Sequence, residues 1–266
     1  MAYSPTRKIT SVITKDQLIQ SFKELGVEEG MTLEVHSSLS AFDYVVGGAQ
    51  TIVDALLDTV GYEGTIAMAM QDSSNSDPAG WQNPPIVHEL HQVIRENTPA
   101  FNRKESNASE MGAVVENLRR REGVSASFSP SCAYVAWGKY ARLICGRQPL
   151  HFPLGEGSPT SHLYDLDGYA LLLGVSYSNC TALHLAEYRS DRRGIIVNAG
   201  AVEMENQRVW KKYLDMDLDA SVFEEIGMQM ERFLDVRRMK INGASCILFN
   251  IREAVDFFTE YMRNSL

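Results

Sequence analysis

The chain has 266 residues, of which 44% are hydrophobic and 22% charged, and this balance predicts one packed globular domain over residues 1–266 rather than a disordered chain. Its formal net charge of −9 disfavours nucleic acid and anionic membranes as partners and would attract a cationic small molecule. The first ten residues, MAYSPTRKIT, contain no apolar segment of the signal-peptide kind, and no apolar run is long enough to span a bilayer, so we expect a cytoplasmic protein.

The first half of the chain alternates helices with strands. A capping box at Thr14 to Gln17 predicts a first helix that ends at Gly26, and a strand is expected at residues 31–36. A helix after Gly47 and Gly48 and a second strand at 65–70 complete a unit that builds parallel sheets. The pattern then predicts a long polar loop at 71–85, helices at about 86–97 and 111–121, and a strand near 125–128.

The second half continues the alternation and places the chain in the α/β class. Residues 129–138 read as a loop that enters a helix, and a helix is expected after Trp137. The apolar run YALLLG at 169–174 is typical of a buried central strand, and 181–189 is predicted to be helical. The remaining predictions are strands at 195–203 and 208–216 joined by a turn at Glu205-Asn206-Gln207, a helix at 223–233, a strand at 244–250 and a last helix at 252–262.

Small polar residues and glycines follow the strand at 31–36. His36, Ser37 and Ser38 stand at its end, and Gly47-Gly48 precede the next helix. Free backbone N–H groups at such a helix start could hold a pyrophosphate, but the spacing alone slightly favours a simple tight loop. The P-loop lysine and the GxGxxG dinucleotide motif are both absent from this segment.

A histidine follows the predicted central strand. His184 and Glu187 lie three residues apart in the segment TALHLAE, so they share one face of a helix at the carboxyl end of that strand. A histidine beside a carboxylate can act as a general base. An exposed pair without a role is the simpler interpretation from the spacing alone.

Cysteines and metal motifs give weaker indications. The four cysteines lie far apart and form no CxxC pair, which indicates buried thiols rather than a zinc site or disulfides. Cys132 could carry an acyl group, but no neighbour in sequence would activate it. The stretch from His88 to His91 is not an HExxH motif, because Gln92 stands where the second histidine belongs. We expect no metal.

Seven stretches in register resemble one family, the aminoglycoside 3-N-acetyltransferases, which differ from the GNAT acetyltransferases. The resemblance extends from about Lys15 to the last helix. The fold that it implies is an α/β/α sandwich around a largely parallel or mixed sheet, with a smaller substrate-facing lobe. The stretches are VHSSLSAFDYVVGGAQTIVDALLDTVGYEGTIAM, DPAGWQNPP, MGAVVENLRRREGV, SPSCAYVAWG, LGEGSPTSHLYDLDGYALLLGV, TALHLAEYR and VWKKYLDMDLD, with Glu110 before the third.

The resemblance implies roles for individual residues. His184 corresponds to the catalytic base, and Asp215 replaces the nearby Glu187 as its expected carboxylate partner. Thr181 corresponds to a hydroxyl beside the thioester of acetyl-CoA. The carboxylates expected to bind the cationic antibiotic are Asp72, Asp77 and Glu110. The expected acetyl-CoA contacts are His36, Ser37, Ser38, Leu39, Val46, Gly47, Gly48, Ser109 and Met111.

The chain departs from the family at three positions, and several hypotheses stay open. Ser129 stands where the family often has histidine, Ala133 where it has serine and Cys180 where it has asparagine. The first two put the details of CoA binding in doubt. The acceptor could be an aminoglycoside or another amine, and the protein a monomer or a homodimer. A non-catalytic acyl-CoA-binding protein and a Cys132 ping-pong enzyme are the weaker alternatives.

Overall fold

The computed structural model describes residues 8–106 and 108–265. Its strands are β1 (Thr32–Ser37), β2 (Thr65–Gln71), β3 (Ser125–Ala126), β4 (Cys132–Gly138), β5 (Tyr169–Leu173), β6 (Ile195–Met204), β7 (Gln207–Met216), β8 (Arg237–Ile241) and β9 (Ala244–Asn250). Its α-helices are α1 (Lys15–Leu25), α2 (Ala49–Val60), α3 (His91–Asn97), α4 (Ala113–Leu118), α5 (Ala141–Cys145), α6 (Pro159–Asp165), α7 (His184–Ser190), α8 (Phe223–Met230) and α9 (Ile251–Ser265). Within these residues no helix is long and apolar enough to cross a bilayer.

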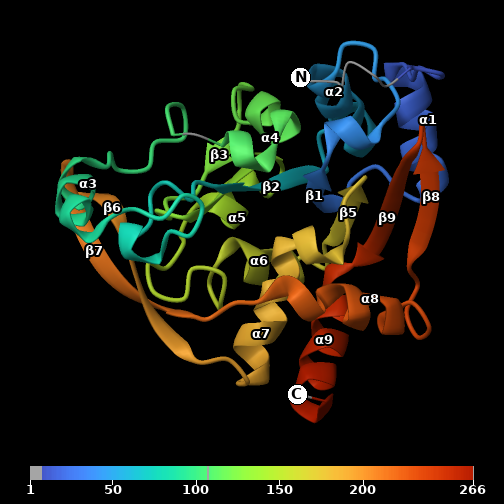
Figure 1. The fold of residues 1–266 in the computed structure, drawn as a ribbon. Helices are drawn as coiled ribbons and strands as arrows, with labels where there is room; N and C mark the ends of the chain where they lie inside the picture. Colours follow the sequence, from blue (N-terminus) through green and yellow to red (C-terminus); the bar gives the residue numbers. More distant parts are fainter. Residues whose placement is uncertain (1–7, 107, 266) are drawn as a thin grey trace.

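Seven of the described strands form one mixed sheet in the order β3-β4-β2-β1-β5-β9-β8. The three central strands run parallel, because β1 pairs in parallel with both β2 and β5. The flanking strands β4 and β9 pair antiparallel with β2 and β5. The sheet is therefore mixed with a parallel centre, and both of its faces are covered (Figure 1).

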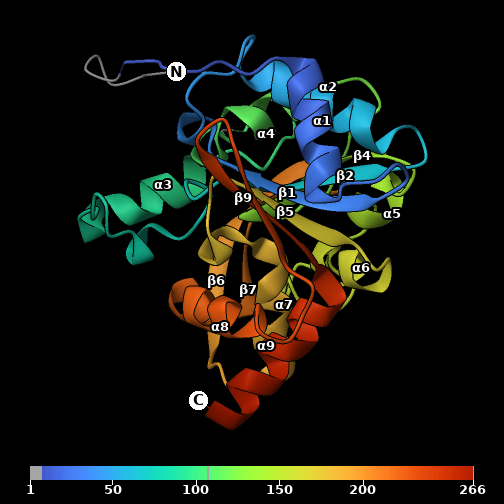
Figure 2. The same cartoon turned by 90° about the vertical axis from the view of Figure 1, so that its right-hand side faces the viewer.

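Helices cover the two faces of the sheet, as the α/β/α prediction requires. In Figure 2, α1 and α2 lie above the sheet, while α6, α7, α8 and α9 lie below it. Successive side chains of β1 point to opposite faces of the sheet. Leu33 and Val35 pack in the core on the side of α1 and α2, so Glu34 and His36 face the opposite layer. Glu34 and His36 therefore point toward the layer of α6 to α9, where the candidate site described below lies.

Local signals set the ends of several elements where the sequence predicts them. Thr14 accepts a hydrogen bond from Gln17 N, the Gln17 side chain accepts one from Thr14 N, and Gly26 ends α1 in the left-handed conformation. The predicted hairpin also forms. Glu205 and Asn206 both have positive φ, which is the two-residue turn that matches the twist of β6 and β7.

The β6–β7 ribbon and α3 form a smaller lobe beside the sheet (Figure 1). Asn75 fixes the loop after β2 to this ribbon, because its side chain bonds both the carbonyl and the N–H of Ala201. Arg208 of β7 donates to the carbonyl of Thr98 at 2.8 Å, just after α3. The long polar loop is thus held against the ribbon by specific hydrogen bonds.

Several predicted elements are wrong or shorter than expected. Residues 132–138 are the strand β4 rather than a loop entering a helix, and β4 pairs along its whole length with β2. Helix α4 begins only at Ala113, because Gly112 has a φ of 90°. Helix α6 and strand β8 were not predicted at all.

Candidate active site

A cavity of about 580 Å³ opens at the carboxyl ends of the parallel strands. The residues that line it come from the ends of β1 and β2, from the segment 110–115, and from the loop between β5 and α7. This is where open α/β sheets place their ligands. The lining residues are Val35, His36, Ser37, Ser38, Leu39, Ser40, Ala69, Gln71, Glu110, Met111, Gly112, Ala113, Val115, Val175, Ser178, Asn179, Thr181 and His184.

The end of β1 supplies the polar wall of the cavity. His36, Ser37, Ser38, Leu39 and Met111, five of the residues expected to contact acetyl-CoA, all line it. The N–H of Ser38 donates to the carbonyl of Leu173 at 2.9 Å, which holds the β1 loop against the end of β5. Parallel pairing thus places the two polar loops side by side.

His184 lines the cavity and contacts a buried carboxylate. It is the first residue of α7, its side chain is 16% exposed, and its Nδ1 lies 2.5 Å from Oε2 of Glu187. An ionised carboxylate only accepts hydrogen bonds, so Nδ1 is the donor, and in a neutral imidazole the lone pair is then on Nε2. The ring of Phe223 packs against the imidazole with centroids 5.0 Å apart. This geometry suits a general base that acts through Nε2.

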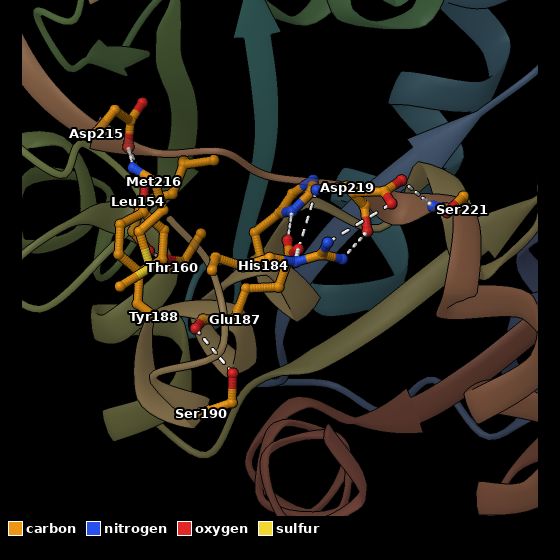
Figure 3. Close-up of polar contacts among 11 residues, drawn as sticks. Leu154, Thr160, His184, Glu187, Tyr188, Ser190, Asp215, Met216, Asp219 and Ser221 are labelled. Carbon is orange, nitrogen blue, oxygen red and sulfur yellow. Dashed lines mark hydrogen bonds and ion pairs between the residues drawn. The ribbon is translucent and has the colours of Figure 1, made fainter. Parts of the chain in front are cut away.

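The second oxygen of Glu187 has its own partners. The Glu187 side chain is fully buried, and its Oε1 accepts hydrogen bonds from Arg193 Nε at 2.7 Å and from Asp219 N at 2.9 Å. Arg193 also donates to the carbonyl of Asp219 at 3.0 Å. Figure 3 shows His184, Glu187 and Asp219 gathered at this point. Both carboxylate oxygens are therefore fixed.

Asp215 is not the hydrogen-bonding partner that the resemblance implies. Its oxygens accept hydrogen bonds from the hydroxyl of Tyr188, from Met216 N at 2.9 Å and from Asn198 Nδ2 at 3.3 Å. In Figure 3 it lies with Tyr188 and Met216, apart from the contact between His184 and Glu187. Burial raises the pKa of Asp215 above its usual range, although the Tyr188 hydrogen bond opposes the rise. The expected pairing is corrected: Glu187 is bonded to His184.

A buried polar cluster lies behind the cavity. Glu34 is fully buried, and its oxygens accept hydrogen bonds from Tyr134 OH at 2.5 Å, Cys180 Sγ at 3.4 Å and Ala182 N at 3.2 Å. His36 Nε2 lies 3.2 Å from the same carboxylate. Burial opposes ionisation of Glu34, but the charge and hydrogen bond of His36 hold its pKa below the usual range. The cluster connects β1 to the segment that carries Thr181 and His184.

The same cluster contains the atoms best placed to hold a metal among the described residues. Glu34, His36 and Cys180 offer ligand atoms that all lie within 4.8 Å of one another. However, His36 Nε2 already has two partners in the protein, the Glu34 carboxylate and Thr181 N, each at 3.2 Å. Burial also raises the pKa of the Cys180 thiol well above its usual range, which disfavours the thiolate that binds metals. Hydrogen bonding accounts for this cluster.

The three expected acceptor-binding carboxylates lie in different surroundings. Glu110 lines the cavity and accepts a hydrogen bond from Ser73 Oγ at 2.7 Å. Asp72 is buried and accepts one from Ser74 Oγ at 2.5 Å. Asp77 forms a 2.7 Å ion pair with Arg95, and although burial opposes ionisation, the Arg95 hydrogen bond holds the pKa of Asp77 below its usual range. Only Glu110 of the three is part of the cavity lining.

Other expected acetyl-CoA contacts lie outside the cavity lining. Val46, Gly47 and Gly48 are not among the residues that line it. Gly47 and Gly48 have φ of 81° and 64°, and a side chain at Gly47 would clash with Thr51 Oγ1, so the tight-loop interpretation fits them. Ser109 lies in a short 3₁₀ segment, Ser109–Met111, and its side chain is outside the described part of the structure.

Cys132 has the properties of an inert thiol. It lies at the start of β4, and burial raises its pKa to about 11, although the Ser131 hydroxyl opposes the rise. A thiol that stays protonated at neutral pH is a poor nucleophile. Cys132 is also absent from the cavity lining.

Two charged residues of this region were not identified from sequence. Glu34 is a charged residue inside an apolar strand, and that was a usable signal, because a buried carboxylate needs partners. Arg193 stands in the charged run RSDRRG, which reads as a solvated turn and gives no sign that it reaches Glu187.

Comparisons with known proteins identify the family to which this chain is related. A family model described as aminoglycoside 3-N-acetyltransferase matches residues 35–263. The SPbeta prophage-derived aminoglycoside N(3')-acetyltransferase-like protein YokD of Bacillus subtilis is 40% identical over 253 residues, covering 95% of this chain and 93% of that protein. Its crystal structure has a TM-score of 0.94, with 96% and 95% of the two chains covered.

Two further relatives also match over nearly the whole chain. Aminoglycoside N(3)-acetyltransferase VIII of Streptomyces fradiae is 31% identical over 271 residues, covering 96% of this chain and 93% of that enzyme. AAC-IIIb, solved as a binary complex with CoASH, is 25% identical with a TM-score of 0.85 and covers 96% of this chain and 97% of its own. The chain belongs to the aminoglycoside 3-N-acetyltransferase family and is an acyltransferase of that family.

Proposed function

We propose that the protein transfers the acetyl group of acetyl-CoA to the 3-amino group of a 2-deoxystreptamine aminoglycoside, with His184 as the base. The observation that carries this proposal is the hydrogen bond between His184 Nδ1 and Glu187, which leaves Nε2 as the accepting nitrogen beside the cavity. The family and the CoASH complex of AAC-IIIb support the choice of cosubstrate.

The reaction needs a base, because a protonated amine has no lone pair. His184 Nε2 takes a proton from the ammonium group, directly or through water, and becomes an imidazolium beside Glu187. The amine nitrogen then forms a bond to the acetyl carbonyl carbon, whose oxygen becomes an oxyanion. When this intermediate collapses, the C–S bond breaks and the CoA sulfur leaves with the electron pair. The sulfur then takes the proton held by His184, and the nitrogen releases its remaining extra proton to solvent to give the neutral amide.

The negative charges around His184 favour the imidazolium that forms during the reaction. Glu187 bonds it directly, while Asp215 is held nearby by Tyr188 and acts through its charge. Thr181 is the candidate oxyanion donor. Its N–H is bonded to His36 Nε2, so the Thr181 hydroxyl is the group that we assign to this role.

Different residues of the cavity and its surroundings are assigned to the two substrates. The β1 loop with His36, Ser37, Ser38 and Leu39, together with Ser109 and Met111, is proposed to bind acetyl-CoA. Glu110 is proposed to bind an ammonium group of the acceptor, with Asp72 and Asp77 adding negative charge farther along the loop.

A panel assay tests this proposal. CoA release from acetyl-CoA is measured with several 2-deoxystreptamine antibiotics and with simple amines, using the native chain and His184→Gln. We expect aminoglycoside-dependent release and a loss of kcat by a factor of about 10² to 10⁴ in the variant, with little change in acetyl-CoA affinity. Near-normal turnover by His184→Gln would rule out its role as base.

One observation favours a second acceptor class. Asp77 is already paired with Arg95, and Asp72 with Ser74, which leaves Glu110 as the cavity carboxylate for a cation. An amine with fewer positive charges than an aminoglycoside would suit this arrangement. Faster CoA release with such amines would support this alternative, whereas CoA binding without release on any amine would indicate a non-catalytic acyl-CoA-binding protein.

A further inference from the structure

Glu187 lies between two groups that can carry positive charge. His184 Nδ1 contacts one carboxylate oxygen at 2.5 Å, and Arg193 Nε contacts the other at 2.7 Å. Because Glu187 is fully buried, its charge has to be balanced within the protein. Arg193, whose side chain is 22% exposed, is always positively charged. It therefore balances the charge of Glu187 whether or not His184 is protonated.

The geometry of Arg193 is fixed on three sides. Besides Glu187, its Nη2 donates to the carbonyl of Asp219 at 3.0 Å, and its Nη1 lies 3.6 Å from the Asp219 carboxylate. The N–H of Asp219 in turn donates to Glu187 at 2.9 Å. Arg193 therefore joins the end of α7 to the loop after β7, and both segments contact the carboxylate that orients His184.

We propose that Arg193 is a positioning residue that shares Glu187 with His184 and thereby keeps the imidazole neutral and available as a base. This inference rests on the proposed role of His184. Without the guanidinium, the buried Glu187 would depend on His184 for its counter-charge, and the His184–Glu187 pair would hold its proton more tightly. Arg193 acts on the reaction only through Glu187.

The direction of the effect follows from the charges near His184. Removing a positive charge leaves a more negative surrounding, so the pair binds its proton up to a higher pH. The charged and titratable groups that face this region are Glu187 on α7, Asp215 on β7, Asp219 in the following loop, and His36 and Glu110 across the cavity. Four of these five groups are acidic. Arg193 supplies a positive charge among them, because its guanidinium is bonded to Glu187.

The expected size is on the order of one pH unit. Two positive charges on opposite sides of one carboxylate, at an effective dielectric constant of about 20, shift each other's protonation by about one to two pH units. The partial exposure of Arg193 lowers this toward one unit through solvent screening.

The test compares Arg193→Gln, which keeps a hydrogen-bond donor but loses the charge, with Arg193→Lys, which keeps the charge. Arg192→Gln is the matched control, because its neighbouring guanidinium bonds the carbonyl of Arg263 instead. The ring signals of His184 are followed by NMR against pH in protein without substrates, with His184→Gln used to assign them. The acid limb of kcat/KM is measured in parallel.

We expect Arg193→Gln to move the titration midpoint of the pair and the acid limb upward by about one pH unit, with activity recovering at higher pH. Arg193→Lys and Arg192→Gln should stay within a few tenths of a unit of the native protein. If Arg193→Gln moves the midpoint no more than Arg192→Gln, or lowers kcat/KM equally at every pH, the proposal is wrong. The NMR titration needs no turnover, so a failure of the proposed function would appear separately as absent CoA release.

Discussion

Replacing Glu187 by glutamine should inactivate the proposed base while leaving its surroundings almost unchanged in shape. In the native protein, one oxygen of Glu187 accepts from Arg193 and Asp219, and the other accepts from His184 Nδ1. A glutamine has only one oxygen. That oxygen will face the side with two donors, so the amide NH₂ will face His184. Nδ1 then has to accept, which moves the ring proton to Nε2.

The size of the effect follows from this tautomer. An imidazole with a proton on Nε2 cannot take a proton from the ammonium group through that nitrogen. The corresponding change from carboxylate to amide in a serine-protease triad lowers kcat by about 10⁴. Because the Asp219 and Arg193 donors already determine the orientation of the amide, we expect a loss of about 10³ to 10⁴ in kcat, which is about 4–5 kcal/mol in activation free energy.

The assay is CoA release at saturating acetyl-CoA, from pH 6 to pH 9. Glu156→Gln is the control, because Glu156 forms an exposed pair with Arg189 of the same helix at 2.8 Å and does not contact His184. A wrong tautomer cannot be rescued by raising the pH, so the loss should persist over the whole range. Recovery of activity at high pH, or a loss no larger than that of Glu156→Gln, would refute the argument.

Three further outcomes are expected. Tyr134→Phe removes the 2.5 Å hydrogen bond to buried Glu34 and should cost about 1–3 kcal/mol in the free energy of unfolding, measured by urea denaturation; an unchanged midpoint would contradict it. Hydrogen bonds from the hydroxyl and N–H of Thr10 lower the pKa of Asp43 to about 2. The contribution of Asp43 to stability is therefore complete above about pH 4 and is lost as the pH falls toward 2, so Asp43→Asn should flatten that part of the acid-unfolding curve. Arg95→Met should free Asp77 and lower KM for a polycationic acceptor by a factor of about 3 to 10 at low salt but not at high salt, with kcat unchanged.

The sequence identified the site best where local spacing determines the contact. His184 and Glu187 are three residues apart, and α7 brings their side chains together, as the helical repeat requires. The resemblance to related enzymes moved the expected partner to Asp215. That contact depends on how the β6–β7 ribbon packs on α7, and in this protein the hydroxyl of Tyr188 binds Asp215 instead.

The errors in the fold have equally local causes. Strand β4 is buried on both faces, so CAYVAWG lacks the alternation that distinguishes a strand from a helix. Helix α6 carried a readable signal that was missed: Ser158 caps it, with Pro159 at its first position. Strand β8, by contrast, is a charged edge strand, RRMKI, and only its pairing with β9 makes it a strand.

The position of the cavity follows from the order of the parallel strands. After β1 the chain passes through α2 on one face of the sheet and returns as β2 on one side of β1. Strand β5 lies on the other side of β1, and its following loop leads to α7 on the opposite face (Figure 2). The two loops therefore separate at the carboxyl ends of β1 and β5 and leave a crevice between them. His36 and His184 both line this crevice, so under the proposed function the strand order places the thioester and the amine within reach of His184.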